Sequence, residues 1–249
     1  MSSTTTEPGA SRGLFLVFEG GEGAGKSTQI ARLARRLASR GVPHRLVREP
    51  GGTPVGERIR DIVLDPALTM CAETELLLVV AARAESVRRL VEPGLRNGDL
   101  VLSDRYELST FAYQGAGRGL GVDTARQVNG FATGGLKPDL TIVLLVASEL
   151  GRGRQSGEAD RLERERGEFH RRVADAYERL AAEDDSIVTV RAEGSPDETH
   201  ELIWGELAAR WPDRFGNFSR PDEFHERGAA RGGADPKPAE AGEAGEESQ

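Results

Sequence analysis

The sequence has little of what would suit it to an oxidising compartment or to a membrane. Its 249 residues include a single cysteine, Cys71. An internal disulfide is therefore excluded, and one isolated thiol is typical of proteins from reducing compartments. The opening residues are polar and lack the apolar segment of a secretory signal, and no apolar run approaches the roughly 20 residues of a membrane span. These features predict a cytoplasmic protein without a membrane partner.

An excess of positive charge is also lacking. The chain has 33 lysines and arginines against 41 aspartates and glutamates, which gives a formal net charge of −8. General attraction to nucleic acid is therefore not expected, and any phosphate site must be a local concentration of positive charge. Only Lys26, Lys137 and Lys237 are lysines, so a lysine inside a motif is more informative here than an arginine.

Both ends lack the apolar residues that ordering a chain requires. Residues 1–12 are small and polar, and residues 216–249 are rich in Gly, Ala, Glu and Pro. Burial there cannot offset the conformational entropy of folding, so both ends are predicted to be disordered. A single domain over residues 13–215 remains, without internal repeats.

Within that domain, short apolar runs alternate with segments of helical periodicity. Strands are predicted over 14–19, 44–49, 100–104, 140–147 and 186–191, with helices after the first glycine-rich turn up to Gly41 and over 55–64, 73–90, 124–132, 164–182 and 196–210. Pro93 and Gly94 are expected to close the third of these helices, and a glycine-punctuated segment follows the third strand. This order predicts an α/β fold, with a parallel five-stranded sheet and helices on both faces.

Polar residues follow the first three predicted strands. The first strand ends at Glu19, the second at Arg48 and Glu49, and the third at Asp104 and Arg105. Ligands of parallel sheets bind beyond the carboxyl ends of the strands. The three polar clusters are therefore expected to meet at one edge of the sheet.

The turn after the first strand carries the motif of P-loop NTPases, G-x-x-x-x-G-K-[ST]. Its backbone N–H groups and the start of the next helix would surround the phosphates of ATP, Lys26 would reach the β- and γ-phosphates, and the Ser27 hydroxyl would bind Mg²⁺. The predicted cofactor-binding residues are Gly20, Gly21, Glu22, Gly23, Ala24, Gly25, Lys26, Ser27 and Thr28.

Four further stretches occur in order after the P-loop: "REPGGTPVGERIR" (48–60), "ELLLVVAAR" (75–83), "SDRYELSTFAYQGAGRG" (103–119) and "KPDLTIVLLV" (137–146). Together with the P-loop they resemble the thymidylate kinase family, whose members phosphorylate dTMP to dTDP with ATP and Mg²⁺. "REPGGTP" and "DRY…S…AYQG" are specific to this family among P-loop kinases. The resemblance also implies a homodimer.

The resemblance implies roles for residues outside the P-loop. Arg48 and Arg105 would bind the acceptor phosphate, since a guanidinium suits bidentate phosphate binding. Asp104 would orient Mg²⁺ or its waters without acting as a base, because a phosphate monoester is already mostly a dianion at pH 7. The remaining expected positions are Glu19 lining the site, Arg83 donating to thymine O4, Tyr113 against the deoxyribose, and Ser109, Thr110 and Gln114 near the base and sugar.

Two places depart from the family's pattern. A phenylalanine usually stacks on thymine where this chain has Val79, which leaves other pyrimidine monophosphates open as acceptors. Family members without an arginine inside the P-loop supply one from a lid over the ATP phosphates. The customary lid position corresponds to Ser156, and Arg152, Arg154 or Arg161 could substitute; Arg154 is the predicted catalytic lid residue.

Two alternatives remain open. A deoxynucleoside kinase of the same fold would phosphorylate a hydroxyl, which requires a general base, and Glu49 is the candidate. A non-catalytic nucleotide-binding module is the other. The intact Gly25-Lys26-Ser27 and Asp104-Arg105 segments favour an enzyme.

Overall fold

The computed structural model describes residues 12–146 and 159–216. The predicted disordered ends lie almost entirely outside these ranges. Residues Met1–Glu206 form one compact unit, which holds the sheet, and Leu207–Gln249 form a second. Within the described part of the second unit, the end of α9 is followed by a short π-helical turn, η3 (Pro212–Gly216).

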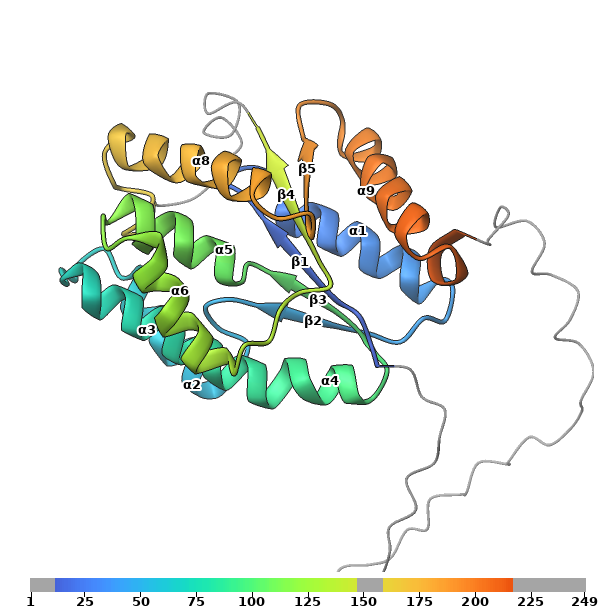
Figure 1. Cartoon of the computed structure of the whole chain (residues 1–249), viewed down its shortest axis with the longest axis horizontal. Helices are drawn as coiled ribbons and strands as arrows, with labels where there is room; N and C mark the ends of the chain where they lie inside the picture. Colours follow the sequence, from blue (N-terminus) through green and yellow to red (C-terminus); the bar gives the residue numbers. More distant parts are fainter. Residues whose placement is uncertain (1–11, 147–158, 217–249) are drawn as a thin grey trace, which may run out of the picture. The chain divides into compact units, whose positions relative to one another are not determined.

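A parallel five-stranded sheet forms the centre of the first unit (Figure 1). The strands are β1 (Phe15–Glu19), β2 (His44–Arg48), β3 (Leu100–Asp104), β4 (Leu140–Leu145) and β5 (Ile187–Arg191), in the order β2-β3-β1-β4-β5. The register aligns Phe18 and Arg48 with Asp104. The carboxyl ends of β1, β2 and β3 therefore lie side by side, and the predicted α/β fold is confirmed.

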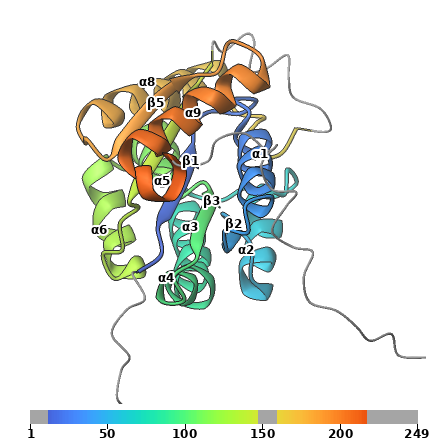
Figure 2. The same cartoon turned by 90° about the vertical axis from the view of Figure 1, so that its right-hand side faces the viewer.

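Helices flank the sheet on both sides (Figure 2). They are α1 (Lys26–Ala38), α2 (Pro54–Leu64), α3 (Ala72–Ser86), α4 (Glu92–Arg96), α5 (Glu107–Thr110), α6 (Val122–Thr133), α8 (Gly167–Ala182) and α9 (Pro196–Arg210). Apolar residues of α1 at helical spacing, Ile30, Leu33, Ala34 and Leu37, are buried. None of the helices among the described residues could span a bilayer.

The helix predicted over 73–90 is longer and less regular than expected. The π-helix η1 (Val87–Val91) continues α3, and α4 then runs through the two residues predicted to end the helix. Pro93 follows the π-helix η1 directly, so its missing N–H falls where the hydrogen-bonding pattern of the helix changes. A Cβ at Gly94 would lie 2.9 Å from Val101 Cγ2. This glycine therefore permits close packing on the sheet instead of ending the helix.

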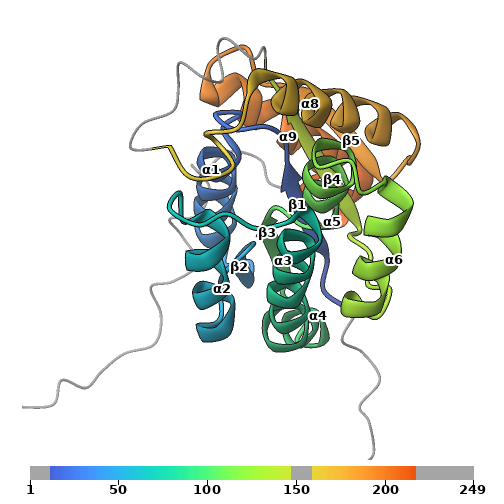
Figure 3. The same ribbon diagram turned by 90° about the vertical axis from the view of Figure 1, so that its left-hand side faces the viewer.

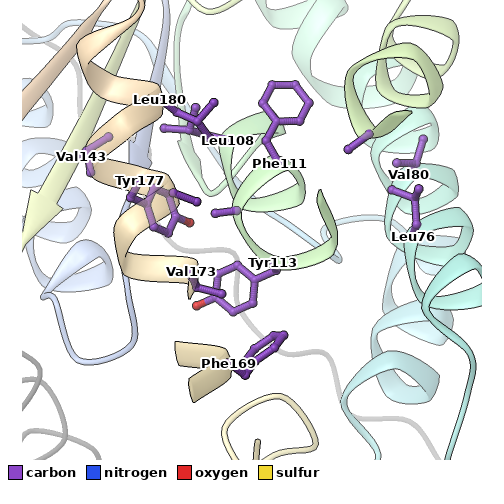
Figure 4. Close-up of a cluster of buried hydrophobic side chains, with 13 residues drawn as sticks. Leu76, Val80, Leu108, Phe111, Tyr113, Val143, Phe169, Val173, Tyr177 and Leu180 are labelled. Carbon is purple, nitrogen blue, oxygen red and sulfur yellow. The ribbon is translucent and has the colours of Figure 1, made fainter. Parts of the chain in front are cut away.

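The glycine-punctuated segment after β3 is also helical. It forms α5 and the π-helix η2 (Phe111–Gly117), which packs against α8. Figure 4 shows Tyr113 of η2 beside Phe169, Val173 and Tyr177 of α8 in one buried cluster. A Cβ at Gly117 would lie 2.7 Å from the Phe169 ring, so this glycine too reflects close packing between helices.

We expect Gly20→Ala to lower the free energy of unfolding by at least about 1–3 kcal/mol. Gly20 has a φ of 132°, and a Cβ there would lie 2.4 Å from the Leu144 carbonyl oxygen. Urea denaturation of the two proteins gives the difference. Gly21→Ala is the matched control, because no atom lies within 4 Å of a Cβ at that position. Equal effects of the two substitutions would contradict this explanation.

Candidate active site

A cleft of about 630 Å³ opens at the carboxyl ends of β1, β2 and β3. Four groups of predicted site residues meet in it: the P-loop and the start of α1, the end of β2, Val79 of α3, and the segment from the end of β3 to η2. The predicted residues that line it are Glu22, Gly23, Gly25, Lys26, Ser27, Thr28, Arg48, Val79, Asp104, Arg105, Ser109, Tyr113 and Gln114. Residues more than 80 positions apart in the chain thus share one cavity.

The P-loop turn places Lys26 in the wall of this cleft. Gly23 and Gly25 have φ angles of 70° and 90°, which a residue with a side chain adopts only with strain. The Lys26 ammonium donates to the carbonyl oxygens of Gly20 (3.1 Å) and Gly21 (2.9 Å). Burial, assisted by the nearby charge of Arg105, lowers the pKa of Lys26 to about 8.

Ser27 and Asp104 place two side-chain oxygen atoms side by side at the P-loop. The Ser27 hydroxyl donates to Asp104 Oδ2 over 2.7 Å, which brings the first turn of α1 against the end of β3. Hydroxyl and carboxylate oxygens are hard ligands of the type that Mg²⁺ prefers. The donor set therefore fits the predicted metal.

Arg105 lies between the P-loop and the aromatic residues of η2 and α8. It is the only residue other than glycine with a positive φ, 74°, among the described residues. Its guanidinium pairs with Glu22 and contacts the Gly20 carbonyl oxygen (3.2 Å), Ser109 Oγ (3.0 Å) and the Tyr113 hydroxyl (3.3 Å). The Arg105 charge, against the opposing effect of burial, lowers the pKa of Glu22 to about 2. Both members of the pair are therefore charged at neutral pH.

Arg48 also has a carboxylate partner. Its Nη2 donates to both oxygens of Glu57 at 2.9 Å, across a half-exposed surface. Glu57 belongs to α2, whose first turn is capped by the Thr53 hydroxyl. The two arginines predicted to bind the acceptor phosphate thus line the same cleft, and each has its own carboxylate.

Glu19 lies elsewhere than predicted. It is completely buried beneath the cleft and does not line it. Its carboxylate accepts from the backbone N–H groups of Tyr106 (2.8 Å) and Ser109 (3.0 Å) and from the hydroxyls of Ser109 (2.6 Å) and Tyr177 (2.9 Å). A carboxylate that follows a buried strand is an obvious candidate for an exposed ligand, but here four donors hold it inside the protein.

Arg83 differs from the prediction in the same way. Its side chain is only 1% exposed and donates to Glu49, Thr110, Asn129 and the Tyr106 carbonyl oxygen. These contacts use four of its five N–H bonds, so at most one remains for a base. Thr110 is likewise completely buried, with its hydroxyl accepting from Arg83.

Of the four positions named for the lid, Arg161 is the one that lies within the described residues. Arg152, Arg154 and Ser156 lie outside the described residues. Arg161 lies within them and donates to the Val63 carbonyl oxygen (2.7 Å) and to Glu75 Oε2 (2.6 Å). These contacts hold its guanidinium between α2 and α3.

Sequence analysis missed three residues that contact the predicted site. Tyr177 on α8 reaches Arg105 and Ser109, Glu57 holds Arg48, and Glu75 holds Gln114. Tyr177 is 72 positions from Arg105. No local motif marks such a residue, because only the packing of α8 on η2 brings it to the site.

Comparison with known proteins gives a consistent result. The family model described as thymidylate kinase matches residues 18–203. The chain is 46% identical to a thymidylate kinase of Deinococcus radiodurans over 203 residues, covering 80% of this chain and 98% of the relative. It is 48% identical to a thymidylate kinase of Synechococcus sp. strain JA-3-3Ab over 200 residues, covering 79% and 96%. A match of this extent, together with the shared cleft of P-loop and arginines, shows that the chain belongs to the thymidylate kinase family.

Proposed function

We propose that this protein transfers the γ-phosphoryl group of ATP to dTMP and releases dTDP and ADP. An oxygen of the dTMP phosphate forms the new bond to the γ-phosphorus, and the bond from that phosphorus to the β–γ bridging oxygen breaks. The observation that carries the proposal is the shared cleft of Lys26, Arg48 and Arg105. A cavity that binds both the triphosphate and the acceptor phosphate permits direct transfer of the phosphoryl group between them.

The donor side uses the P-loop. Its backbone N–H groups and Lys26 would bind the triphosphate, and Ser27 and Asp104 would hold Mg²⁺ directly or through water. The bound metal ion would neutralise charge on the β- and γ-phosphates. The Asp104 carboxylate accepts a hydrogen bond from the Ser27 hydroxyl. This contact supports a role for Asp104 in orienting the Mg²⁺ site.

The acceptor side needs no general base. The second pKa of a phosphate monoester is near 6, so its attacking oxygen is already ionised at pH 7. The protein contributes position and positive charge around a loose transition state. Arg105 and Arg48 supply this charge, and the acceptor phosphate competes with Glu22 and Glu57 for them.

The nucleoside would lie against Tyr113 and Val79, which both line the cleft. Tyr113 packs on Phe169 and Tyr177 and points its hydroxyl at Glu22 and Arg105, which supports a rigid wall beside the sugar. Val79 offers an apolar contact to the base without aromatic stacking, at a cost of roughly 0.5–1.5 kcal/mol relative to phenylalanine. A predicted cytoplasmic location, based on cysteine usage, completes the proposal.

One observation supports a second candidate, a deoxynucleoside kinase. Glu49 lines the same cleft, and its Oε1 is buried with no hydrogen-bond partner in the part of the chain that the structure describes. Burial raises the pKa of this carboxyl against the opposing effect of Arg83, as suits a general base for a hydroxyl acceptor.

Kinetics with different acceptors separate these candidates. With Mg-ATP we expect dTMP to be phosphorylated and thymidine to be inert, because the cleft supplies two arginines for a phosphate. The assay measures ADP release across dTMP, dUMP, dCMP and the parent nucleosides. Phosphorylation of thymidine alone would favour the Glu49-based kinase. Tight ATP binding without turnover of any monophosphate would indicate a non-catalytic module.

The affinity for MgATP should depend on the protonation of Lys26. With a pKa of about 8, Lys26 is mostly protonated at pH 7 and loses its proton as the pH rises. Above pH 8 the triphosphate must therefore bind together with a proton, so the Kd should rise by up to about tenfold per pH unit. Calorimetry at pH 9 in buffers of different ionisation enthalpy measures this proton uptake.

The control for this measurement is Lys26→Arg, whose guanidinium does not titrate in this range. Its Kd for MgATP should change little between pH 7 and 9, whatever its absolute value. A constant Kd and no proton uptake in the unsubstituted protein would contradict the role given to Lys26.

We also propose that the protein is a homodimer that pairs through α2, α3 and α6. Figure 3 shows α3 between α2 and α6, and these helices expose large apolar side chains. Val55 and Ile62 on α2, Leu77 on α3 and Phe131 on α6 are 53%, 43%, 59% and 91% exposed. Several exposed large apolar side chains on neighbouring helices are typical of an interface.

Phe131→Glu should raise the dimer dissociation constant by at least about tenfold, because it places a charge at the most exposed apolar position. Sedimentation velocity over a concentration series measures this constant. Leu202→Glu on α9 is the matched control, since Leu202 is 57% exposed and lies on none of the three helices. A monomeric parent protein, or dissociation caused by the control alone, would refute this interface.

A further inference from the structure

We propose that Glu75 is a positioning residue for base selection, which fixes the amide of Gln114 with its oxygen toward the acceptor. The inference deepens the proposed function and rests on it. Gln114 Nε2 donates to Glu75 Oε1 over 2.7 Å, and both side chains are buried. Gln114 also lines the cleft together with Val79 and Tyr113.

Three donors surround the Glu75 carboxylate. Arg118 Nε donates to both of its oxygens at 3.1 Å, and Arg161 Nη2 donates to Oε2 at 2.6 Å, in addition to the bond from Gln114. Burial alone would raise the pKa of Glu75, but the hydrogen bonds from Arg118, Gln114 and Arg161 outweigh burial and lower it. The carboxylate is therefore ionised at neutral pH and can only accept hydrogen bonds.

An acceptor at this position determines which way the Gln114 amide faces. The NH₂ group must lie toward Glu75, because the amide oxygen would be repelled by a carboxylate. Gln114 Oε1 then lies on the opposite side of the amide, and no donor contacts it within residues 12–146 and 159–216. A hydrogen-bond acceptor of fixed orientation is thus available to a base in the cleft.

The helical spacing supports this arrangement from both sides. Glu75 and Val79 are four residues apart on α3, so the positioning carboxylate and the apolar wall share one helix face. Gln114 and Arg118 are likewise four residues apart at η2, and Arg118 also pairs with Glu165 of the segment before α8. Both α3 and η2 therefore supply one residue that lines the cleft and one residue of the hydrogen-bonded group around Glu75.

The orientation of the Gln114 amide should distinguish pyrimidine bases by the group that they carry at N3. Thymine and uracil carry an N–H at N3, which can donate to Gln114 Oε1. Cytosine has a lone pair at N3, which would face the amide oxygen and leave two buried acceptors without donors. The mismatch should reduce the efficiency of dCMP phosphorylation by roughly 10- to 150-fold.

Glu75→Gln tests the role of the carboxylate. Arg118 and Arg161 would hold the carbonyl oxygen of the new amide, so its NH₂ would face Gln114. Gln114 would then turn over and point its own NH₂ into the cleft. We expect the ratio of kcat/KM for dTMP to that for dCMP to fall at least about tenfold, mainly through KM. An equal loss for both substrates would overturn the proposal, because a merely structural role affects them alike.

Glu165→Gln is the matched control, since it removes the other carboxylate partner of Arg118 and leaves Glu75 in place. It should not change the selectivity ratio. Gln114→Leu removes the amide, and in that background Glu75→Gln should change the ratio no further. A change of the same size with and without Gln114 would mean that Glu75 acts by another route and would overturn the proposal.

A measurement on the unsubstituted protein guards against a variant that does not fold. N3-methyl-dTMP lacks the N–H and should be phosphorylated far less efficiently than dTMP, whereas dUMP keeps the N–H and should retain most of the selectivity over dCMP. Equal use of dTMP and N3-methyl-dTMP would overturn the orientation assigned to Gln114. If no monophosphate is phosphorylated, the proposed function itself fails, and this inference fails with it.

Discussion

The buried guanidinium of Arg83 holds together the segments that form the acceptor side of the cleft. From α3 it donates to Glu49 after β2, to the Tyr106 carbonyl oxygen after β3, to Thr110 on α5 and to Asn129 on α6. A planar group with five donors in fixed directions suits this task, since each bond defines both a distance and an angle. The positions of Arg48 and Arg105 depend on these same segments.

Such an arrangement is stable only when every partner is present. Glu49 and Arg83 are 3% and 1% exposed, so each shields the other's charge from an apolar interior. Removing one member of a buried pair typically costs about 3–5 kcal/mol, a large share of the 5–15 kcal/mol that keeps a domain folded. Charged residues thus have two distinct roles here. A few line the cleft, and others are buried in the protein and hold in place the segments that form the cleft.

The strands and most of the helices could be predicted from the sequence, because apolar periodicity records burial directly. The π-helix after β3 could not, since Gly115 and Gly117 suggest a loop unless one knows that the start of α6 packs closely on Gly115 and α8 on Gly117. The cleft followed from the strand ends because the topology of a parallel sheet brings those ends together. Whether a polar residue there faces the cleft or the interior depends on its partners, as Glu19 and Arg83 show, and those partners come from distant parts of the chain.

The carboxylates beside the two clamp arginines have a consequence for anions in general. Glu22 and Glu57 are counter-ions that are covalently part of the protein, so their effective concentration beside Arg105 and Arg48 does not depend on the solution. A small monovalent anion that contacted only one arginine would have to displace this carboxylate and would gain no further contacts to offset the lost ion pair. A nucleotide can offset both exchanges at once, because its phosphate engages two guanidiniums while its sugar and base contact the walls. Chloride from the surroundings is therefore a weak competitor for this site.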